Sequence, residues 1–404
     1  MEIVRFGDLY ELPSSNGVSR PSAVRGDGFH MINMGELFSH SIINEIPMDR
    51  VQLSSKEQTK FFVEKGDLLF ARQSLVASGA GKCSIVNNII ERTTFESHLI
   101  RVRLNKKCNP WYYFYLFQLP YNPVKTIVNQ CAQAGIRGSE LSKIKVPFPD
   151  IIIQDKIASI LSAYDSLIEN NTKRVRLLEQ MAENLYKEWF VRFRFPGHEK
   201  VEMENGLPKG WRRERISQFY NTCSGGTPSR AKEEYFENGN IPWVKTGEIQ
   251  DSIIIDTEEH ITEDAIKHSS AKMLPAKSIV MAMYGVNIGK LAYLNKEMSC
   301  NQACCVFMDK RDFSSRHYLF HYLFSIREYL LMIGFGAAQQ NLSQEMIKNI
   351  RIIMPEDIVL KAFERKVDIM YDEVLNLTKQ TQSLTRQRDL LLPRLMSGKL
   401  EVKV

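Results

Sequence analysis

The sequence predicts an α+β fold in which two mixed α/β domains alternate with two long helices that pack on each other as a coiled coil. The first observation is a duplication. Residues 144–149 (IKVPFP) and 350–355 (IRIIMP) match at an offset of about 206, and so long an offset indicates repeated domains. The second is that a long stretch of helical apolar spacing follows each match. The expected boundaries are, in chain order, a domain at 1–150, a helix in 151–198, a domain at 199–350 and a helix in 351–404.

Short apolar runs between clusters of Gly, Ser and Asn predict strands in both domains. The runs lie at similar places in the two halves, so the domains are expected to be two copies of one architecture. The expected strands are Asp67–Phe70, His98–Val102, Ser278–Ala282 and Cys304–Met308, and the expected helices are Trp111–Leu119 and His317–Leu331.

The first long helix is predicted over residues 154–192. Alternating steps of four and three residues from Ile157 meet an apolar or aromatic residue everywhere except at Asn171, and this period is typical of a coiled-coil seam. At 1.5 Å per residue the helix is roughly 58 Å long. The predicted seam is Ile157, Leu161, Tyr164, Ile168, Asn171, Val175, Leu178, Ala182, Leu185 and Trp189.

The second long helix has the same period, with polar interruptions at Thr381 and Arg388. Because such apolar stripes are unstable in water, we expect the two helices to pack on each other, with the polar positions fixing their register. The alternative is that each helix lies on its own domain. Pro149 and Pro355 precede the two helices, and Pro393 is expected to end the second. The predicted apolar seam is Leu360, Phe363, Val367, Met370, Val374, Leu377, Leu384, Leu391 and Leu395.

Composition excludes several classes of protein. With 404 residues, the chain can form two or three domains with cores of their own. It has no apolar run of about 18 residues and no signal-peptide pattern, so we expect a cytoplasmic protein without a membrane span. Seven cysteines without a C-x-x-C pair indicate reduced thiols and no metal site. The net charge of +6 permits a nucleic-acid partner without requiring one.

No catalytic motif is complete in this sequence. Asn109-Pro110-Trp111-Tyr112 is close to the N-P-P-aromatic motif of adenine methyltransferases, but its third residue is tryptophan, and we interpret Asn-Pro as the start of a helix. P-loop, zinc-protease and esterase motifs are absent. His98 lies in an apolar run and is expected to be a packed core residue. We therefore expect no catalytic residue, no metal and no cofactor in this chain.

Binding chemistry is better represented. Arginine, glutamine and hydroxyl side chains on glycine-containing loops suit guanine edges, adenine edges and phosphates. Such loops recur at equivalent places in the two domains, although ordinary solvated loops remain the alternative. The candidate DNA contacts are Arg72, Gln73, Ser74, Ser78, Lys82 and Arg137 in the first domain, and Thr227, Ser229, Arg230, Tyr284, Asn287, Lys290, Gln339 and Gln340 in the second.

Four segments together resemble the specificity subunit (HsdS) of type I restriction-modification systems. They are Leu207–Trp211, Ser224–Ser229, Ile241–Ile249 and Arg388–Gly398. The resemblance covers the whole chain and adds Lys245, within the third segment, to the candidate DNA contacts. In the first domain, Ser14–Arg20 is only loosely similar to the Gly-Gly-Thr-Pro pattern of the second.

The resemblance implies a division of labour with partner subunits. Two target recognition domains would each read one half of an asymmetric, bipartite site in double-stranded DNA, and the long helices would pack antiparallel and set the gap. Two HsdM subunits with S-adenosylmethionine would methylate adenine, and HsdR subunits with ATP would translocate and cleave DNA. This chain would be a non-catalytic subunit, whose target sequence cannot be derived from its residues.

A coiled-coil scaffold with two protein-binding domains is the alternative function. Salt separates the two hypotheses, because DNA binding through several phosphates weakens steeply with salt. An apolar protein interface lacks that dependence.

Overall fold

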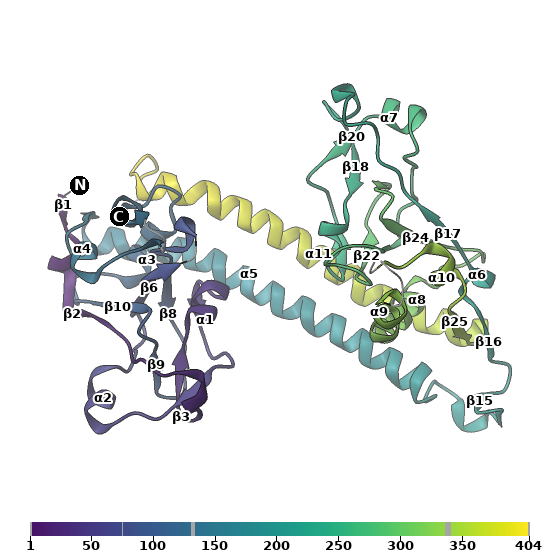
Figure 1. The fold of residues 1–404 in the computed structure, drawn as a ribbon, viewed down its shortest axis with the longest axis horizontal. Coiled ribbons are helices and arrows are strands. Elements are labelled where there is room, and N and C mark those ends of the chain that lie inside the picture. The colour runs from purple at the N-terminus through teal and green to yellow at the C-terminus, as the bar shows by residue number, and fades with distance from the viewer. Residues whose placement is uncertain (1, 75, 131–133, 336–340, 403–404) are drawn as a thin grey trace. The chain divides into compact units, whose positions relative to one another are not determined.

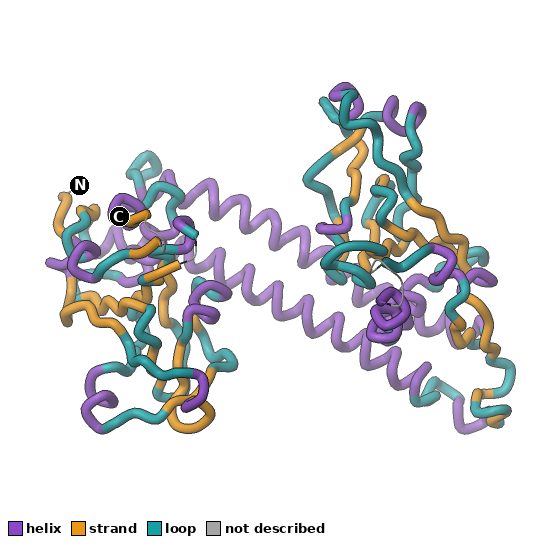
Figure 2. The backbone as a smooth tube through the Cα atoms, in the orientation of Figure 1, coloured by secondary structure: helices purple, strands orange, loops and turns teal. Residues whose placement is uncertain are grey.

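A computed structural model of the chain describes residues 2–74, 76–130, 134–335 and 341–402. The chain divides into two compact units (Figure 1): unit 1 is Met1–Glu169 with Gln382–Val404, and unit 2 is Asn170–Thr381. Helices α5 (Ile151–Tyr186) and α11 (Asp357–Met396) continue through the unit boundaries. Both units mix short strands with helices and many loops (Figure 2), so the predicted α+β class is confirmed.

The main sheet of unit 1 has five strands in the order β2-β10-β6-β8-β4. Neighbouring strands are antiparallel, except that β4 and β8 are parallel. Every residue of β6 and β8 is buried, as expected for central strands with both faces covered. The strands are β2 (Tyr10–Asn16), β10 (Leu99–Leu104), β6 (Leu68–Ala71), β8 (Cys83–Val86) and β4 (Ile42–Ile43).

Alternation along the strands builds two cores, one on each face of this sheet. Leu68 and Phe70 pack with the aromatic residues of α3 (Pro110–Gln118), whereas Leu69 and Ala71 pack with Leu37 and Phe95 on the opposite face. The smaller elements surround these cores. They are β1 (Glu2–Arg5) paired with β13 (Lys145–Phe148); the sheet of β5 (Asp49–Val51), β3 (Arg25–Ile32) and β9 (Thr93–Phe95); the sheet of β11 (Asn129–Gln130), β12 (Ala134–Gly135) and β7 (Gln73–Ser74); and helices α1 (Met34–Ser39), α2 (Ser55–Lys60) and α4 (Gly138–Leu141).

The main sheet of unit 2 repeats that of unit 1 strand for strand. It has the order β17-β24-β21-β22-β19, again with a single parallel pair, β19 and β22. The sheet of unit 1 formed by β5, β3 and β9 has its counterpart in β20, β18 and β23. The strands are β17 (Tyr220–Ser224), β24 (Cys304–Asp309), β21 (Ile279–Ala282), β22 (Leu291–Leu294), β19 (Ser252–Ile254), β20 (His260–Ile261), β18 (Ile241–Val244), β23 (Ser299–Cys300), β16 (Arg212–Arg215) paired with β25 (Arg351–Met354), and β14 (Met203–Glu204) paired with β15 (Leu207–Pro208).

Short helices complete unit 2. The helix expected over His317–Leu331 is two helices, α8 (Arg316–Ser325) and α9 (Arg327–Phe335), separated at Ile326. α8 packs on the main sheet through Tyr318 and Leu319, as α3 does in unit 1. The remaining helices are α6 (Ile216–Phe219), α7 (Glu263–His268) and α10 (Gln344–Lys348).

The two long helices pair in antiparallel fashion inside each unit. In unit 1, Arg388 of α11 donates to Asp165 of α5 at 2.6 Å. In unit 2, Asn171 donates to Gln380 at 3.4 Å and Arg174 to Glu373 at 2.6 Å. Residue numbers fall along α11 as they rise along α5, so the predicted coiled coil is confirmed.

The polar positions of the seam all have partners within the helix pair. Asn171 and Arg388 bond across it, and the Thr381 hydroxyl donates to the carbonyl oxygen of Leu377. The apolar seam positions are buried or half-buried, so the stripe is removed from water in both units.

The helix ends differ from the sequence prediction in two places. α5 begins at Ile151 instead of Gln154 and continues after Tyr186 as a π-helical turn, Lys187–Val191. The prediction that Pro393 ends the second helix is wrong, because α11 continues through it to Met396. A proline lacks one N–H group and removes a single helical hydrogen bond, and here Leu392, Leu395 and Met396 pack into the core of unit 1. That packing keeps the last turn in place.

Candidate nucleic-acid interface

A tight chain crossing follows the first strand of the main sheet in both units. The residue after β2 is Gly17, and a Cβ atom there would lie 1.9 Å from the carbonyl oxygen of Phe95. The residue after β17 is Gly225, and a Cβ atom there would lie 1.9 Å from the carbonyl oxygen of Cys300. Only glycine fits either position without a backbone shift. The next residue of each crossing donates its N–H to the same carbonyl oxygen at 2.9 Å.

This equivalence makes Ser14–Arg20 of unit 1 the structural counterpart of the Gly-Gly-Thr-Pro segment of unit 2. In sequence the two segments are only loosely similar, because they share one glycine and differ in the side chains around it. After each crossing an arginine pairs with a glutamate. Arg20 lies 2.7 Å from Glu57, and Arg230 lies 2.6 Å from Glu259.

The candidate residues after the crossing of unit 2 lie around one acidic side chain. Glu259 accepts from Lys245 at 3.0 Å as well as pairing with Arg230, and the two cations lower its pKa. The Arg230 guanidinium also stacks over the rings of Phe236 and Trp243, at 4.4 and 5.2 Å. Both cations therefore share one acidic partner within the unit, which neutralises part of their charge.

The two predicted loops of unit 1 lie side by side. Strand β7 lies in the loop that follows β6, and β12 lies in the loop that precedes α4. They pair with Gln73 opposite Gly135. The carbonyl oxygen of Arg72 accepts from the N–H of Ile136 at 2.9 Å. A short sheet thus joins Arg72, Gln73 and Ser74 to the segment that carries Arg137.

The side chains of these loops differ in how free they are. The Ser74 hydroxyl accepts from the N–H of Val76 at 3.2 Å, and the Lys82 ammonium donates to the carbonyl oxygen of Phe38 at 2.7 Å. Ser78 and Arg137 are exposed. Within the part of the chain that the structure describes, the Arg72 and Arg137 guanidinium groups have no hydrogen-bonded or ion-paired partner. These two cations are therefore the most available to an incoming anion in this unit.

The prediction that His98 is a packed core residue is wrong. This residue lies one position before β10, in a turn, and is exposed. Its Nδ1 atom lies 3.0 Å from Oε1 of Gln73. The residue that looked like part of an apolar run therefore stands beside a predicted base-reading side chain, and local hydropathy contained no signal for this.

The corresponding loop of unit 2, residues 284–290, is held by side chains instead of a small sheet. The Asn287 amide is buried and donates to the carbonyl oxygens of Thr246 and Gly247, at 2.9 and 3.2 Å. Lys290 donates to Oε1 of Gln250 at 2.5 Å. Asn287 thus fastens one loop to another, and its amide donors are already used there.

Two residues that the sequence prediction missed hold the base of the same loop. Arg327, at the start of α9, donates to the carbonyl oxygen of Gly289 at 3.1 Å and forms a bidentate pair with Asp251. Asp251 also accepts the N–H of Leu291 at 3.0 Å. Asp251 and Arg327 are 76 positions apart in the sequence, so no local motif could have linked them.

The remaining candidates of unit 2 have simpler surroundings. Thr227 and Ser229 are exposed, and the Thr227 hydroxyl donates to Gln302. Tyr284 is exposed on the loop described above. Gln339 and Gln340 lie outside the described residues, although the carbonyl oxygen of Met283 accepts from the N–H of Leu342 at 3.0 Å. The segment that follows these glutamines thus contacts the chain next to loop 284–290.

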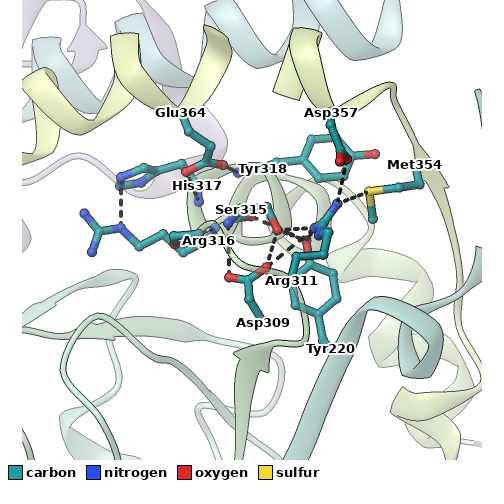
Figure 3. A network of polar contacts seen from close by, with 11 residues as sticks. Tyr220, Asp309, Arg311, Ser315, Arg316, His317, Tyr318, Met354, Asp357 and Glu364 are labelled. Atoms are coloured by element: carbon teal, nitrogen blue, oxygen red, sulfur yellow. Dashed lines mark hydrogen bonds and ion pairs between the residues drawn. The ribbon is translucent and has the colours of Figure 1, made fainter. Parts of the chain in front are cut away.

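A buried polar network holds α8 in place in unit 2 (Figure 3). Glu364 of α11 accepts the backbone N–H groups of His317 and Tyr318, at 3.3 and 2.9 Å, at the N-terminus of α8. Arg316 and His317 lie 2.5 and 3.0 Å from Asp368. Four charged or polar side chains thereby attach α8 to α11.

Burial sets the protonation of this network. Removal from water raises the pKa of Glu364 to about 8, even though two N–H groups favour the carboxylate. Removal from water also lowers the pKa of His317 to about 4. The hydrogen bond from His317 lowers the pKa of Asp368 to about 2. The network joins α8 to α11, which argues for a structural role.

The donor chemistry gives no sign of a metal site. No group of three or more His, Cys, Asp or Glu side chains that could hold an ion occurs among the described residues. The six cysteines of the described part of the chain are free thiols.

Asn109 caps α3, as predicted, by accepting the N–H of Trp111 at 2.9 Å. None of the helices in the described ranges has the length and apolarity that crossing a membrane requires.

Known proteins match both the sequence and the fold. The family model "Type I restriction modification DNA specificity domain" matches residues 1–180 and 208–375. The specificity subunit of the type I restriction enzyme MjaIX of Methanocaldococcus jannaschii is 31% identical over an alignment of 304 positions, which covers 72% of this chain and 69% of that protein. The HindI specificity subunit of Haemophilus influenzae is 24% identical over an alignment of 413 positions, which covers 85% of this chain and 88% of that protein.

A solved structure matches the fold over nearly the whole chain. The crystal structure of a type I restriction-modification S subunit from M. genitalium aligns with a TM-score of 0.66 at 14% sequence identity. The alignment covers 98% of this chain and 95% of that chain. At this identity the likeness shows a shared fold.

Proposed function

The chain belongs to the family of DNA specificity subunits of type I restriction-modification systems, and we propose that each of its units reads one half of a bipartite DNA site. Members of this family are non-catalytic subunits that act with other subunits on DNA. The finer proposal is that units 1 and 2 read different half-sites, so that the full site is asymmetric.

One observation carries this proposal: two copies of one fold present different side chains on equivalent loops. The loop after β6 offers Arg72, Gln73 and Ser74, whereas the loop after β21 offers Tyr284 and Val286. Different donors, acceptors and apolar groups select different base edges. A duplicated scaffold with divergent loops therefore suits the reading of two unlike half-sites.

The long helices are proposed to set the gap between half-sites and to dock two methyltransferase subunits. Their seams are closed by antiparallel pairing, and a closed helix pair resists bending. S-adenosylmethionine and ATP are expected on the partner subunits HsdM and HsdR. The residues of this chain would bind and orient DNA, while the partners supply the chemistry.

The test is the site that a partner methyltransferase modifies when this chain is varied. Gln73→Ala should relax or abolish one half-site, by roughly 1–3 kcal/mol if the contact is bidentate. The other half-site and the gap should stay the same. A methylation motif and rate identical to the wild type would show that the β6–β8 loop does not read DNA.

A second test separates the gap from the half-sites. Inserting four residues near Asn171 adds about 6 Å of helix and rotates it by about 40° beyond a full turn. An active mutant should keep both half-sites and lengthen the gap by about two base-pair steps of about 3.4 Å each. An active mutant with an unchanged gap would show that the helices do not set it.

Salt dependence tests the scaffold alternative directly. Affinity for DNA should fall steeply between 50 and 200 mM salt, with a slope proportional to the number of phosphate contacts, by roughly 10³-fold for about six contacts. A salt-independent interaction with protein and no measurable affinity for DNA would favour the coiled-coil scaffold.

A further inference from the structure

Val286 stands at the tip of the loop 284–290 with its side chain in solvent. It is 98% exposed, although it is a large apolar residue. Tyr284, two positions earlier, is also exposed. Gly285 between them has a φ angle of +79°. This backbone conformation turns the chain sharply, and residues other than glycine rarely adopt it. The tip is thus an apolar projection from the unit.

The projection is rigid, because the loop is attached at several points. The N–H of Gly289 donates to the carbonyl oxygen of Ala282 at 2.8 Å, closing the base of the loop. Asn287 and Arg327 bond it to neighbouring segments. An exposed apolar residue on a mobile loop would have many conformations to lose on binding, whereas this one is already ordered.

Unit 1 repeats the feature in the equivalent loop. Val76, between β7 and β8, is 60% exposed. Like Val286, it comes shortly before a lysine, Lys82 or Lys290, that bonds to a neighbouring segment. Single exposed apolar residues need no explanation on a protein surface. The same feature on the equivalent loop of both copies needs one.

We propose that Val286 reads the C5-methyl group of a thymine in the half-site of unit 2. Valine offers no hydrogen bond, so it can recognise only an apolar group on a base edge. In the major groove, the thymine methyl group is the apolar feature that distinguishes one base pair from the others. The inference rests on the proposed function and adds one base-specific contact to it.

The experiment removes the methyl group from the DNA and the side chain from the protein in turn. The full chain, co-purified with its methyltransferase partner, is titrated with duplexes of the mapped site. Each A·T pair of both half-sites is changed singly to A·U, which removes only the methyl group. For one pair, wild-type affinity should fall about three- to tenfold, and Val286→Ala should show little further loss on that duplex. Val76→Ala is the matched control and should leave that sensitivity intact.

Several results would overturn the proposal. One is that Val286→Ala lowers the affinity for the A·T duplex and for the A·U duplex equally, which would indicate a contact other than the methyl group. Others are no change in either affinity, or a half-site without thymine. Loss of the methyltransferase partner with unchanged DNA affinity would identify the tip as a protein contact. In all these cases specific binding of the mapped site persists, whereas failure of the proposed function would appear as no specific DNA binding by the wild type.

Discussion

The same joint is built with different chemistry in the two units. In unit 1, the N-terminus of α3 is tied to α5 through the buried amide of Gln154, which accepts the N–H of Asn109 at 2.9 Å. In unit 2, the N-terminus of α8 is tied to α11 by Glu364, a buried carboxyl group that accepts two N–H groups. Both joints satisfy helix donors that would otherwise lack partners. The architecture therefore fixes where a polar acceptor is needed and leaves open whether it can ionise.

The recognition loops differ in a similar way. The unit 1 loop pairs through the short strands β7 and β12, whereas the unit 2 loop depends on the side chains of Asn287, Asp251 and Arg327. Backbone pairing tolerates changes of side chain, but side-chain braces do not. We expect the unit 2 loop to be the more sensitive of the two to substitutions outside its tip.

The largest effects are expected at the feature that the units share. Gly17→Ala and Gly225→Ala each force a Cβ atom against a backbone carbonyl group, and we expect each to lower the free energy of unfolding by roughly 3 kcal/mol. Gly35→Ala and Gly247→Ala are controls, because their added Cβ atoms meet nothing within 4 Å. Chemical denaturation measures all four. Clearly unequal losses for the first two would mean that the crossings are not equivalent.

The next largest effects should separate the joints. Glu364→Ala leaves two buried N–H groups of α8 without an acceptor, and we expect a loss of free energy of unfolding of about 2–3 kcal/mol. Gln154→Ala leaves the N–H of Asn109 and the carbonyl oxygen of Pro149 unpaired. We expect this change to lower the free energy of unfolding by about 1–3 kcal/mol. Thermal unfolding of both variants at one pH measures the difference. A more destabilising Gln154→Ala would reverse the comparison.

The pH dependence should come from unit 2. The pKa of Glu364 is raised from 4.5 to about 8. The folded state therefore holds a proton that the unfolded state has lost, and stability falls as the pH rises across that interval. Burial lowers the pKa values of His317 and His321 from 6.5 to about 4 and about 3, so stability falls as the pH drops below 6.5. Burial also raises the pKa of Glu179 to about 7. The two carboxyl groups therefore offset the two histidines between pH 4.5 and 6.5, and the melting temperature should fall as the pH rises above 6.5.

A matched variant isolates the alkaline side of this profile. Glu364→Gln keeps an oxygen acceptor but cannot ionise, so its melting temperature should fall less than that of the wild type between pH 6.5 and 8. Burial raises the pKa of Glu179 to about 7, so that carboxyl group accounts for the decline that remains. Gln154→Ala, whose joint carries no buried acid, should keep the wild-type slope. Parallel decline of Glu364→Gln and the wild type would assign the pH dependence to another group.

The smallest effects are expected at the equivalent lysines. Lys82→Ala and Lys290→Ala should each weaken binding to all DNA sequences alike and reduce the salt slope by about one. Both side chains now bond to a neighbouring segment, and each ammonium group has further donors for a phosphate. Titrations at several salt concentrations measure the slope. A change in sequence preference would show that these lysines contact base edges.

Most of the architecture could be predicted from the sequence because it follows from apolar periodicity. The strands expected at Asp67–Phe70 and Cys304–Met308, and the seam positions of both long helices, depend on which residues leave water. The end of α11 could not be predicted, because tertiary packing of Leu395 and Met396 overrides the local effect of Pro393. The break between α8 and α9 likewise had no local signal.

The positions of the candidate loops could be predicted, but the contacts of their side chains could not. Loop composition indicated Gln73 and Lys290 as candidate DNA contacts, and their loops follow equivalent strands of the two main sheets. Burial of Asn287 and exposure of His98 depend on distant segments. The pairing of Asp251 with Arg327 does too. Such contacts are consequences of the fold, so a local pattern cannot contain them.

The most direct test of the central claim is a genome-wide map of methylated adenines in cells that express this chain with its partner methyltransferase. Two copies of one scaffold with divergent loops predict a motif of two different half-sites separated by a fixed gap. In the same map, Gln73→Ala should change only one half-site and Val286→Ala only the other. A continuous or perfectly palindromic motif, or one in which both variants alter the same half, would contradict the account.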